Sequence, residues 1–192
     1  MTLASSSLKT YTADEYLTLE VESDIRHEYR HGAIIPMTGG TPEHNKIASA
    51  LNALLWFALR GKPYSLFITD QRLWIPAMNI YTYPDGMVTA DPVELKPGRK
   101  DTVTNPLLLA EVLSDSTEKY DRGDKFEAYR TLATLQEYLL IDQYRPHVEQ
   151  YVKQSEHQWL FTEYSGLDTR VQISSLPVEL ALNDLYQGIF SA

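Results

Sequence analysis

Apolar residues recur at helical spacing between residues 41 and 61. The apolar positions are Ile47, Leu51, Leu54, Leu55, Ala58 and Leu59. Thr41 is suited to cap the start of this helix, Pro42 to occupy its first position and Gly61 to end it. A single apolar stripe along such a helix predicts that the helix packs against a sheet.

Three shorter segments also have helical patterns. Thr12 and Glu15 have the spacing of a capping box, which predicts a short helix over about residues 13–19. Another helix is expected over roughly residues 119–133, and residues 180–189 are expected to end the chain as a short helix. We expect the first of these helices to lie at the periphery.

Extended patterns predict the strands of a sheet. Two short runs flank His31 and Gly32, where glycine permits the positive φ of a tight hairpin, and Glu28 lies on the first run. Further extended segments are expected within residues 64–75 (one or two strands), 81–90, 107–113, 137–142 and 147–164, the last being a hairpin that turns at about 154–156. The order of elements predicts an α/β or α+β domain with a mixed sheet.

The composition suits one domain over residues 1–192, since 43% of the residues are hydrophobic and supply a sizeable core. The absence of cysteine excludes disulfides, thiolate metal sites and cysteine nucleophiles. Residues 1–16 lack the apolar core of a signal peptide, and no segment reaches the roughly 20 apolar residues that span a bilayer. We therefore expect a cytoplasmic protein without a membrane partner.

The formal charge of −9 argues against a protein that coats nucleic acid through a broad basic face. It leaves a metal-dependent enzyme open, because carboxylates that hold divalent ions add to the negative charge and are neutralised by the metal. The chain has no G-x-S-x-G elbow, Walker loop or H-E-x-x-H motif, so nucleophilic and phosphate-loop mechanisms lack support.

Glu111 is the one acid within the apolar run 107–113. A buried carboxylate costs several kcal/mol unless it has a partner or takes up a proton. Asp85 is the nearest unusual acid on an extended segment, and sequential strands are often neighbours, so the two carboxylates are expected near the same end of the sheet. Strand parity places Glu111 on the face of Leu107, Leu109 and Leu113. Two such acids indicate either a divalent-metal site, with Mg²⁺ or Mn²⁺ favoured by oxygen ligands, or a pair that shares a proton.

Structural interpretations compete with the metal site. Glu111 could instead pair with an arginine such as Arg122 or Arg130. Asp85 followed by Gly86 also has the chemistry of a turn. These alternatives stay open on residue types alone.

The dipeptide Pro84-Asp85, followed by Glu111-Val112-Leu113 on the next strand, resembles the PD-(D/E)XK nuclease superfamily, and specifically the Uma family of restriction-endonuclease-like proteins. Most of the chain shares the resemblance, through the segments "HEYRHGAIIPM", "PEHNKIASAL", "YPDGMV", "EVLSDST", "YDRGDKFEAYR" and "EYLLID". The resemblance implies a restriction-endonuclease-like αβββαβ core, a mixed β-sheet flanked by helices, here with an additional β-hairpin. It also implies that Asp85 and Glu111 ligate metal, with the carbonyl of Val112 as a third ligand.

The sequence departs from the superfamily pattern at Leu113, where a lysine usually follows the second acid. Lys125 resembles the lysine that relatives offer from the following helix, from where it could reach back to the acids. Its structural alternative is a solvated helix lysine that contacts Tyr129 or Asp121.

Glu28 resembles the family's acid in E-x-x-x-G and would be a further metal ligand or a residue that orients one. It could instead pair with Arg26 or Arg30 across the hairpin. His44 is a candidate to contact the metal ligands without binding the metal itself. The alternative is that His44 caps the long helix or packs against the sheet.

The resemblance and the residues together predict a Mg²⁺- or Mn²⁺-dependent endonuclease that hydrolyses phosphodiester bonds in DNA, with Asp85, Glu111, Lys125 and Glu28 as site residues. A homodimer is expected, since cutting both strands of a duplex needs two active sites or two visits. The alternatives are a catalytically silent nuclease-like module that binds nucleic acid or a protein partner, and a dimeric scaffold in which the acids are structural.

Overall fold

The computed structural model describes residues 9–190. Its amino-terminal elements are α1 (Ala13–Glu22), β1 (His27–Arg30) and β2 (Ala33–Pro36). The capping box is present, because the Thr12 hydroxyl accepts from the Glu15 amide and the Glu15 carboxylate accepts from the Thr12 amide. The hairpin turns at His31 and Gly32, whose φ angles of 51° and 83° match the twist of the flanking strands. Both local predictions are confirmed, and α1 extends three residues beyond the expected end.

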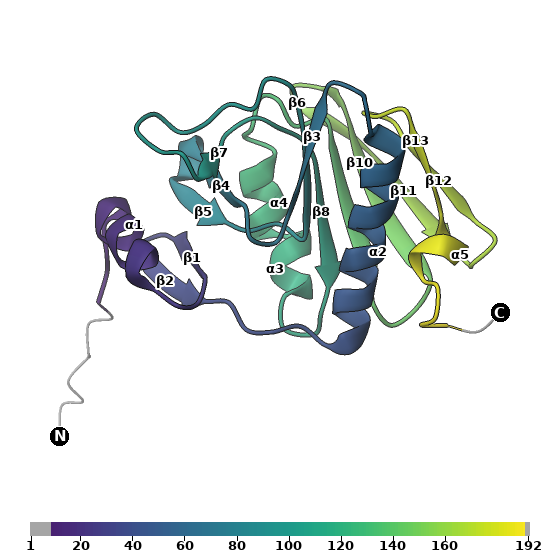
Figure 1. The fold of residues 1–192 in the computed structure, drawn as a ribbon, viewed down its shortest axis with the longest axis horizontal. Coiled ribbons are helices and arrows are strands. Elements are labelled where there is room, and N and C mark those ends of the chain that lie inside the picture. Colours follow the sequence, from purple (N-terminus) through teal and green to yellow (C-terminus); the bar gives the residue numbers. More distant parts are fainter. Residues whose placement is uncertain (1–8, 191–192) are drawn as a thin grey trace.

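The long helix α2 (Pro42–Leu59) has the predicted boundaries. The Thr41 hydroxyl accepts from the His44 amide at 3.1 Å, and Gly61 takes a positive φ of 77° just after the helix. Four residues of the apolar stripe are buried, namely Ile47, Leu51, Leu55 and Leu59. Figure 1 shows α2 lying across a sheet, as its single apolar stripe requires.

That sheet is mixed and has six strands in the order β11-β10-β9-β8-β6-β3. The strands are β3 (Tyr64–Ile68), β6 (Gly86–Ala90), β8 (Pro106–Leu113), β9 (Glu137–Asp142), β10 (His147–Ser155) and β11 (Gln158–Ser165). Only β8 and β9 pair in parallel, and the other neighbours are antiparallel. We predicted that the strand near Asp85 and the strand that contains Glu111 are neighbours. This prediction is confirmed, since β6 pairs with β8.

A second sheet has the order β2-β1-β5-β4-β7. Its further strands are β4 (Arg72–Ile75), β5 (Ile80–Thr82) and β7 (Thr102–Val103), with the short helix η1 (Pro76–Met78) between β4 and β5. The prediction of one strand over residues 81–90 is wrong, because β5 belongs to this sheet and β6 to the other. Pro84 has no amide hydrogen for a ladder, and the chain passes from one sheet to the other at that point.

The helix expected over residues 119–133 is instead two short helices, α3 (Glu118–Arg122) and α4 (Asp124–Tyr129). Gly123 separates them with φ −107° and ψ −105°, a conformation outside the helical region. The carboxyl-terminal part holds a hairpin that the sequence patterns missed, β12 (Arg170–Ile173) with β13 (Val178–Ala181), and then α5 (Leu182–Leu185). The expected helix over 180–189 is therefore shorter, because Leu180 and Ala181 belong to β13.

The core consists of two large apolar clusters on opposite faces of the six-stranded sheet. The first contains residues of α2, β12, β13 and α5, and the second contains Leu109 and Leu113 of β8 together with residues of β4 and α4. Leu107 packs against the first cluster, which corrects the prediction that it shares a face with Glu111. The pairing of β6 with β8 changes register between Val88 and Thr89, and such a bulge interrupts the alternation of faces.

No helix among residues 9–190 has the length and apolar character needed to cross a membrane.

Candidate active site

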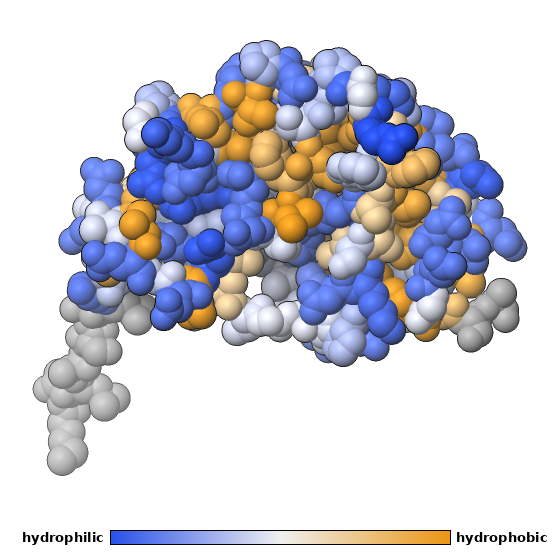
Figure 2. Space-filling view, in the orientation of Figure 1, coloured by the Kyte–Doolittle hydropathy of each residue, from blue (hydrophilic) through white to orange (hydrophobic). Residues whose placement is uncertain are grey.

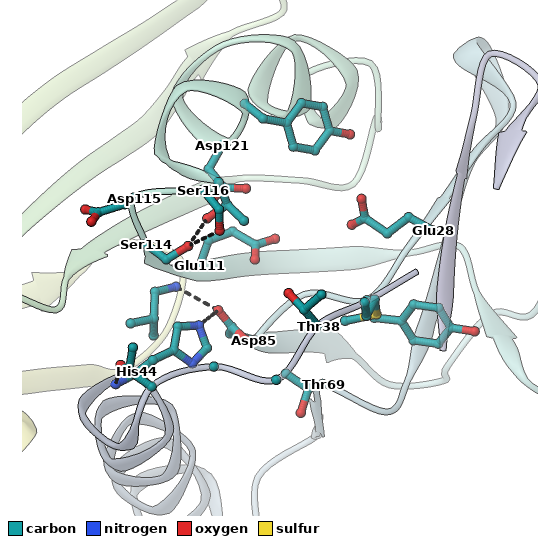
Figure 3. A pocket seen from close by; sticks show the side chains of 18 of the residues that line it. Glu28, Thr38, His44, Thr69, Asp85, Glu111, Ser114, Asp115, Ser116 and Asp121 are labelled. Atoms are coloured by element: carbon teal, nitrogen blue, oxygen red, sulfur yellow. Dashed lines mark hydrogen bonds and ion pairs between the residues drawn. The ribbon is translucent and has the colours of Figure 1, made fainter. Parts of the chain in front are cut away.

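Five acidic side chains line one cavity of about 580 Å³, and four of them come from separate segments of the fold. Glu28 comes from β1, Asp85 directly precedes β6, Glu111 lies on β8 and Asp121 lies on α3 (Figure 3). Pairing of Gly86 with Ala110 brings Asp85 next to Glu111 at this end of the sheet. The structure thus places acids from four separate segments around the same space.

Glu111 is buried, with 4% of its surface exposed. Its Oε1 lies 2.8 Å from Lys125 Nζ and accepts a hydrogen bond of 2.7 Å from the Tyr129 hydroxyl. Burial raises the pKa of Glu111 to about 8, the charges of Asp121 and Asp85 act in the same direction, and the charge of Lys125 opposes them. Without a further cation, this carboxyl changes its charge near neutral pH.

Lys125 reaches the acids from α4 with a buried side chain. Its Nζ lies 2.8 Å from Glu111, 3.2 Å from Asp121 and 3.8 Å from Glu28. Burial by itself lowers the pKa of Lys125, but the three carboxylates outweigh it and hold the pKa well above its ordinary value. The structural alternative predicted a contact between Lys125 and Asp121, and that contact is present. The same alternative predicted that Lys125 is solvated, which is wrong because the side chain is buried.

Asp85 is bound on both sides by main-chain and side-chain groups. Its Oδ2 accepts from the Val112 amide at 2.8 Å and lies 3.2 Å from His44 Nε2, and its carbonyl accepts from Asn52 Nδ2 at 2.9 Å. The hydrogen bond to Asp85 raises the pKa of His44 against the effect of burial. The turn interpretation is present alongside the position in the cavity, since the chain bends at Asp85 and β6 begins at Gly86.

Glu28 faces the same cavity from the second sheet. The Thr82 hydroxyl donates to its Oε1, and Arg30 Nε lies 3.7 Å from its Oε2. Arg26 pairs with Asp70 instead. Glu28 therefore lies in the cavity, as a metal ligand would, and also contacts Arg30, as the structural alternative predicted.

The arginine partners considered for Glu111 lie elsewhere. Arg122 binds Glu118 and Glu149, each at 2.5 Å, and the Arg130 guanidinium lies 5.1 Å from the centre of the Phe126 ring. The partner of Glu111 in this structure is the lysine.

Asp121 and Tyr129 belong to the site although the sequence did not assign them to it. Asp121 is 2% exposed, and its Oδ1 makes no hydrogen bond with the described residues, although Lys125 Nζ is 3.2 Å away. Both residues lie four positions from Lys125, one before it and one after it. That spacing of one helical turn is the signal that could have identified them.

The donor set fits a hard divalent cation. Five carboxylates line the cavity, from Glu28, Asp85, Glu111, Asp115 and Asp121, against the two cations of Arg30 and Lys125. Among the described residues, no hydrogen bond or ion pair engages Glu111 Oε2 or Asp85 Oδ1, so each acid keeps one oxygen for a cation. Oxygen donors of this kind suit Mg²⁺ or Mn²⁺.

The comparison with known proteins adds the family. The family described as "Uma2: Putative restriction endonuclease" matches residues 13–184. The chain belongs to the Uma2 family. This match confirms the resemblance seen in the sequence.

Relatives and a solved structure extend the match. The Synechocystis protein sll1609, described as uncharacterized, is 40% identical over 90% of this chain and 98% of its own length. A second uncharacterized Synechocystis protein, slr1290, is 35% identical over 96% of each chain. A crystal structure from Anabaena variabilis, titled as a putative nuclease belonging to DUF820, superposes with a TM-score of 0.74 at 20% identity and covers 91% of this chain and 97% of that one. The shared fold confirms the predicted restriction-endonuclease-like architecture.

Proposed function

We propose that this Uma2-family protein is a metal-dependent endonuclease that hydrolyses phosphodiester bonds in DNA. The observation that carries the proposal is the position of three side chains. Asp85, directly before β6, lies next to Glu111 on the neighbouring strand β8, and Lys125 lies between Glu111 and Asp121. Membership of a family described as "Putative restriction endonuclease" supports nuclease chemistry on a nucleic acid. The metal and the preference for DNA are the further steps of the proposal.

Asp85, Glu111 and Glu28 would hold Mg²⁺ or Mn²⁺, with the carbonyl of Val112 as a main-chain ligand. A bound ion of this type lowers the pKa of a water molecule and offsets charge on the scissile phosphate. His44 and the Val112 amide fix the orientation of Asp85 through Oδ2. The hydrogen bond from Tyr129 fixes Glu111 through Oε1 in the same way.

Lys125 acts as a cation in this proposal and not as a base. Its neighbours Glu111 and Asp121 hold its pKa well above the ordinary value, so it keeps its proton at neutral pH. A protonated ammonium next to the acids can position a water molecule by hydrogen bonding and stabilise negative charge that develops on the phosphate. Leu113, which stands where the superfamily has lysine, packs in the second apolar cluster, and Lys125 reaches Glu111 from α4 instead.

Strands β3 and β11 form the two edges of the six-stranded sheet. Figure 2 shows apolar side chains gathered around α2 and β3 on one face, and Trp56, Phe57 and Ile68 are more than half exposed. An unpaired edge strand beside exposed apolar residues is suited to pairing with another chain. We propose a homodimer through the surface formed by Trp56, Phe57 and Ile68.

Cleavage of supercoiled plasmid with Mg²⁺, Mn²⁺ or EDTA tests the function. The wild type should nick or linearise the plasmid only with metal, and Asp85→Asn should abolish cleavage. Asp168→Asn is the matched control, because Asp168 is an exposed aspartate that does not line the cavity, and it should cleave like the wild type.

A parallel reaction with single-stranded RNA of mixed sequence tests the DNA preference, and faster cleavage of RNA would refute that part of the proposal. Gel-shift titrations with the same DNA distinguish the enzyme from the catalytically silent module that only binds nucleic acid. Binding of DNA without cleavage under either metal would favour that alternative over the enzyme.

A further inference from the structure

A second group of metal-ligand side chains lies on β10 and β11, and none of its members lines the cavity described above. His147 and Glu149 project from the same face of β10, two residues apart, and Glu163 lies opposite Glu149 in the antiparallel pairing. One ligand atom from each of the three lies within 4.8 Å of the other two. Within residues 9–190, no other group of three such side chains is drawn this close together.

The imidazole of His147 points a free nitrogen into this group. The residue is 4% exposed, and its Nε2 makes no hydrogen bond with the described part of the chain. The nearest charged atoms are the Oε1 atoms of Glu163 at 3.5 Å and Glu149 at 3.8 Å. The other ring nitrogen, Nδ1, pairs with the Ser165 hydroxyl at 2.8 Å. When Nδ1 carries the ring proton and donates it to Ser165, Nε2 keeps the lone pair that a metal ion requires.

The charges around His147 leave room for a cation. Glu149 and Glu163 are directly opposed on neighbouring strands, an arrangement of like charges that destabilises a sheet. Arg122 compensates in part by binding Glu149 and Glu118, and the Tyr151 hydroxyl lies 3.4 Å from Glu149 Oε2. Glu149 and Glu118 thus share one guanidinium, and Glu163 receives none of its contacts.

We propose that His147, Glu149 and Glu163 form a second metal site, which takes a divalent transition-metal ion of the Zn²⁺ and Co²⁺ class. Imidazole with carboxylate ligands suits these ions, whereas the all-oxygen set in the cavity suits Mg²⁺ or Mn²⁺. His147 Nε2 and one oxygen from each glutamate supply three ligands, and solvent completes the coordination because Glu163 is more than half exposed. Ser165 orients the imidazole, and Arg122 orients Glu149.

The position of this site gives it a structural consequence. Arg122 belongs to α3, the helix that also carries Asp121 into the cavity. A metal ion bound to Glu149 would fix the position of the carboxylate that binds Arg122. Because Arg122 lies on α3, the ion would also restrain that helix. Binding of Zn²⁺ should therefore raise the melting temperature of the protein, since the ligands come together only in the folded state.

Calorimetric titration of the metal-free protein with Zn²⁺ tests the proposal, with the visible absorption of bound Co²⁺ as the spectroscopic signature. All titrations use the Asp85→Asn background, so that the cavity does not contribute a signal that depends on Asp85. One Zn²⁺ per chain should bind. Glu163→Gln, a change at a mostly exposed position, should lower the Zn²⁺ affinity at least roughly tenfold, the size of effect that loss of an orienting partner alone can produce.

Two further variants and one control complete the test. Ser165→Ala should weaken Zn²⁺ binding by roughly tenfold through the lost orientation of His147, and His147→Gln should remove the Co²⁺ absorption. Glu156→Gln is the matched control, because Glu156 is an exposed glutamate in the turn between the same two strands. Zn²⁺ binding that is absent, or equal in Glu163→Gln, Ser165→Ala and the control, would overturn the proposal. If circular dichroism shows that His147→Gln is unfolded, the other two variants decide alone.

Discussion

The burial of Glu111 should make the stability of the protein depend on pH in a way that one substitution removes. Glu111→Gln keeps the size and hydrogen-bonding shape of the side chain but cannot ionise. In the folded wild type the pKa of Glu111 is raised from an ordinary 4.5 to about 8, first by burial and then by Asp121 and Asp85. The variant replaces a group that is charged at high pH and neutral at low pH by one that is always neutral.

The direction of the effect follows from proton binding. Between pH 4.5 and about 8 the folded state holds a proton on Glu111 that the unfolded state has released. The contribution of Glu111 is therefore fully present below pH 4.5, is lost as the pH rises through this window, and is gone above pH 8. The whole shift corresponds to roughly 5 kcal/mol at most, at about 1.4 kcal/mol per unit of pKa.

Urea unfolding with EDTA, at about pH 5.5 and about pH 9, measures this contribution. At the lower pH, which is one unit above the unfolded-state pKa of 4.5, Glu111→Gln should be more stable than the wild type by only about 1.4 kcal/mol. At the higher pH Glu111→Gln should be more stable than the wild type by several kcal/mol, because it no longer buries a carboxylate next to Asp121 and Asp85. Glu156→Gln, at an exposed position, should follow the wild type at both pH values.

Addition of Mn²⁺ at the higher pH extends the experiment. The ion requires the ionised carboxylate, so it should restore stability to the wild type and have a smaller effect on Glu111→Gln. A difference between the two proteins that is the same at both pH values would refute the reasoning. A large loss of stability in Glu111→Gln at both pH values would show that the pair with Lys125 is a structural salt bridge.

Three more predictions concern metal binding, catalysis and assembly. Mn²⁺ or Mg²⁺ should raise the melting temperature of the wild type but not of Asp85→Ala, and a folded wild type without any shift at millimolar metal would count against the metal site. Lys125→Ala should keep the Mn²⁺-dependent rise but cleave plasmid roughly 10²-fold more slowly, whereas Lys119→Ala, at an exposed position on α3, should cleave normally. Cleavage by Lys125→Ala at the wild-type rate would exclude the role given to this lysine. Light scattering should give a dimer that Phe57→Ser weakens, and a mass near 21.9 kDa at micromolar concentration would exclude the dimer.

The residues of the site show how far local pattern reaches. Glu111 stood out because an acid within an apolar run needs a partner, and strand order then pointed to Asp85. The resemblance to the Uma family added Glu28 and Lys125. The actual partner of Glu111 could not be read from the sequence, because Lys125 and two arginines were all within reach of the chain and only the packing of α4 against β8 selects among them.

Features that depend on neighbouring residues were determined by the sequence alone. The capping box of α1, the glycine turn between β1 and β2, and the two ends of α2 each follow from the conformational preferences of a few adjacent residues. Those preferences act within about one turn of helix or one tight turn, so the surrounding fold leaves them unchanged.

Features that depend on distant pairing were decided only by the tertiary structure. The segment 81–90 divides between two sheets, and Leu107 changes face at a register shift. Asp121 reaches the cavity from α3, which packs against β8. In each case the free energy comes from contacts between residues far apart in the chain, and such contacts leave no periodic signal in the sequence around any one of them.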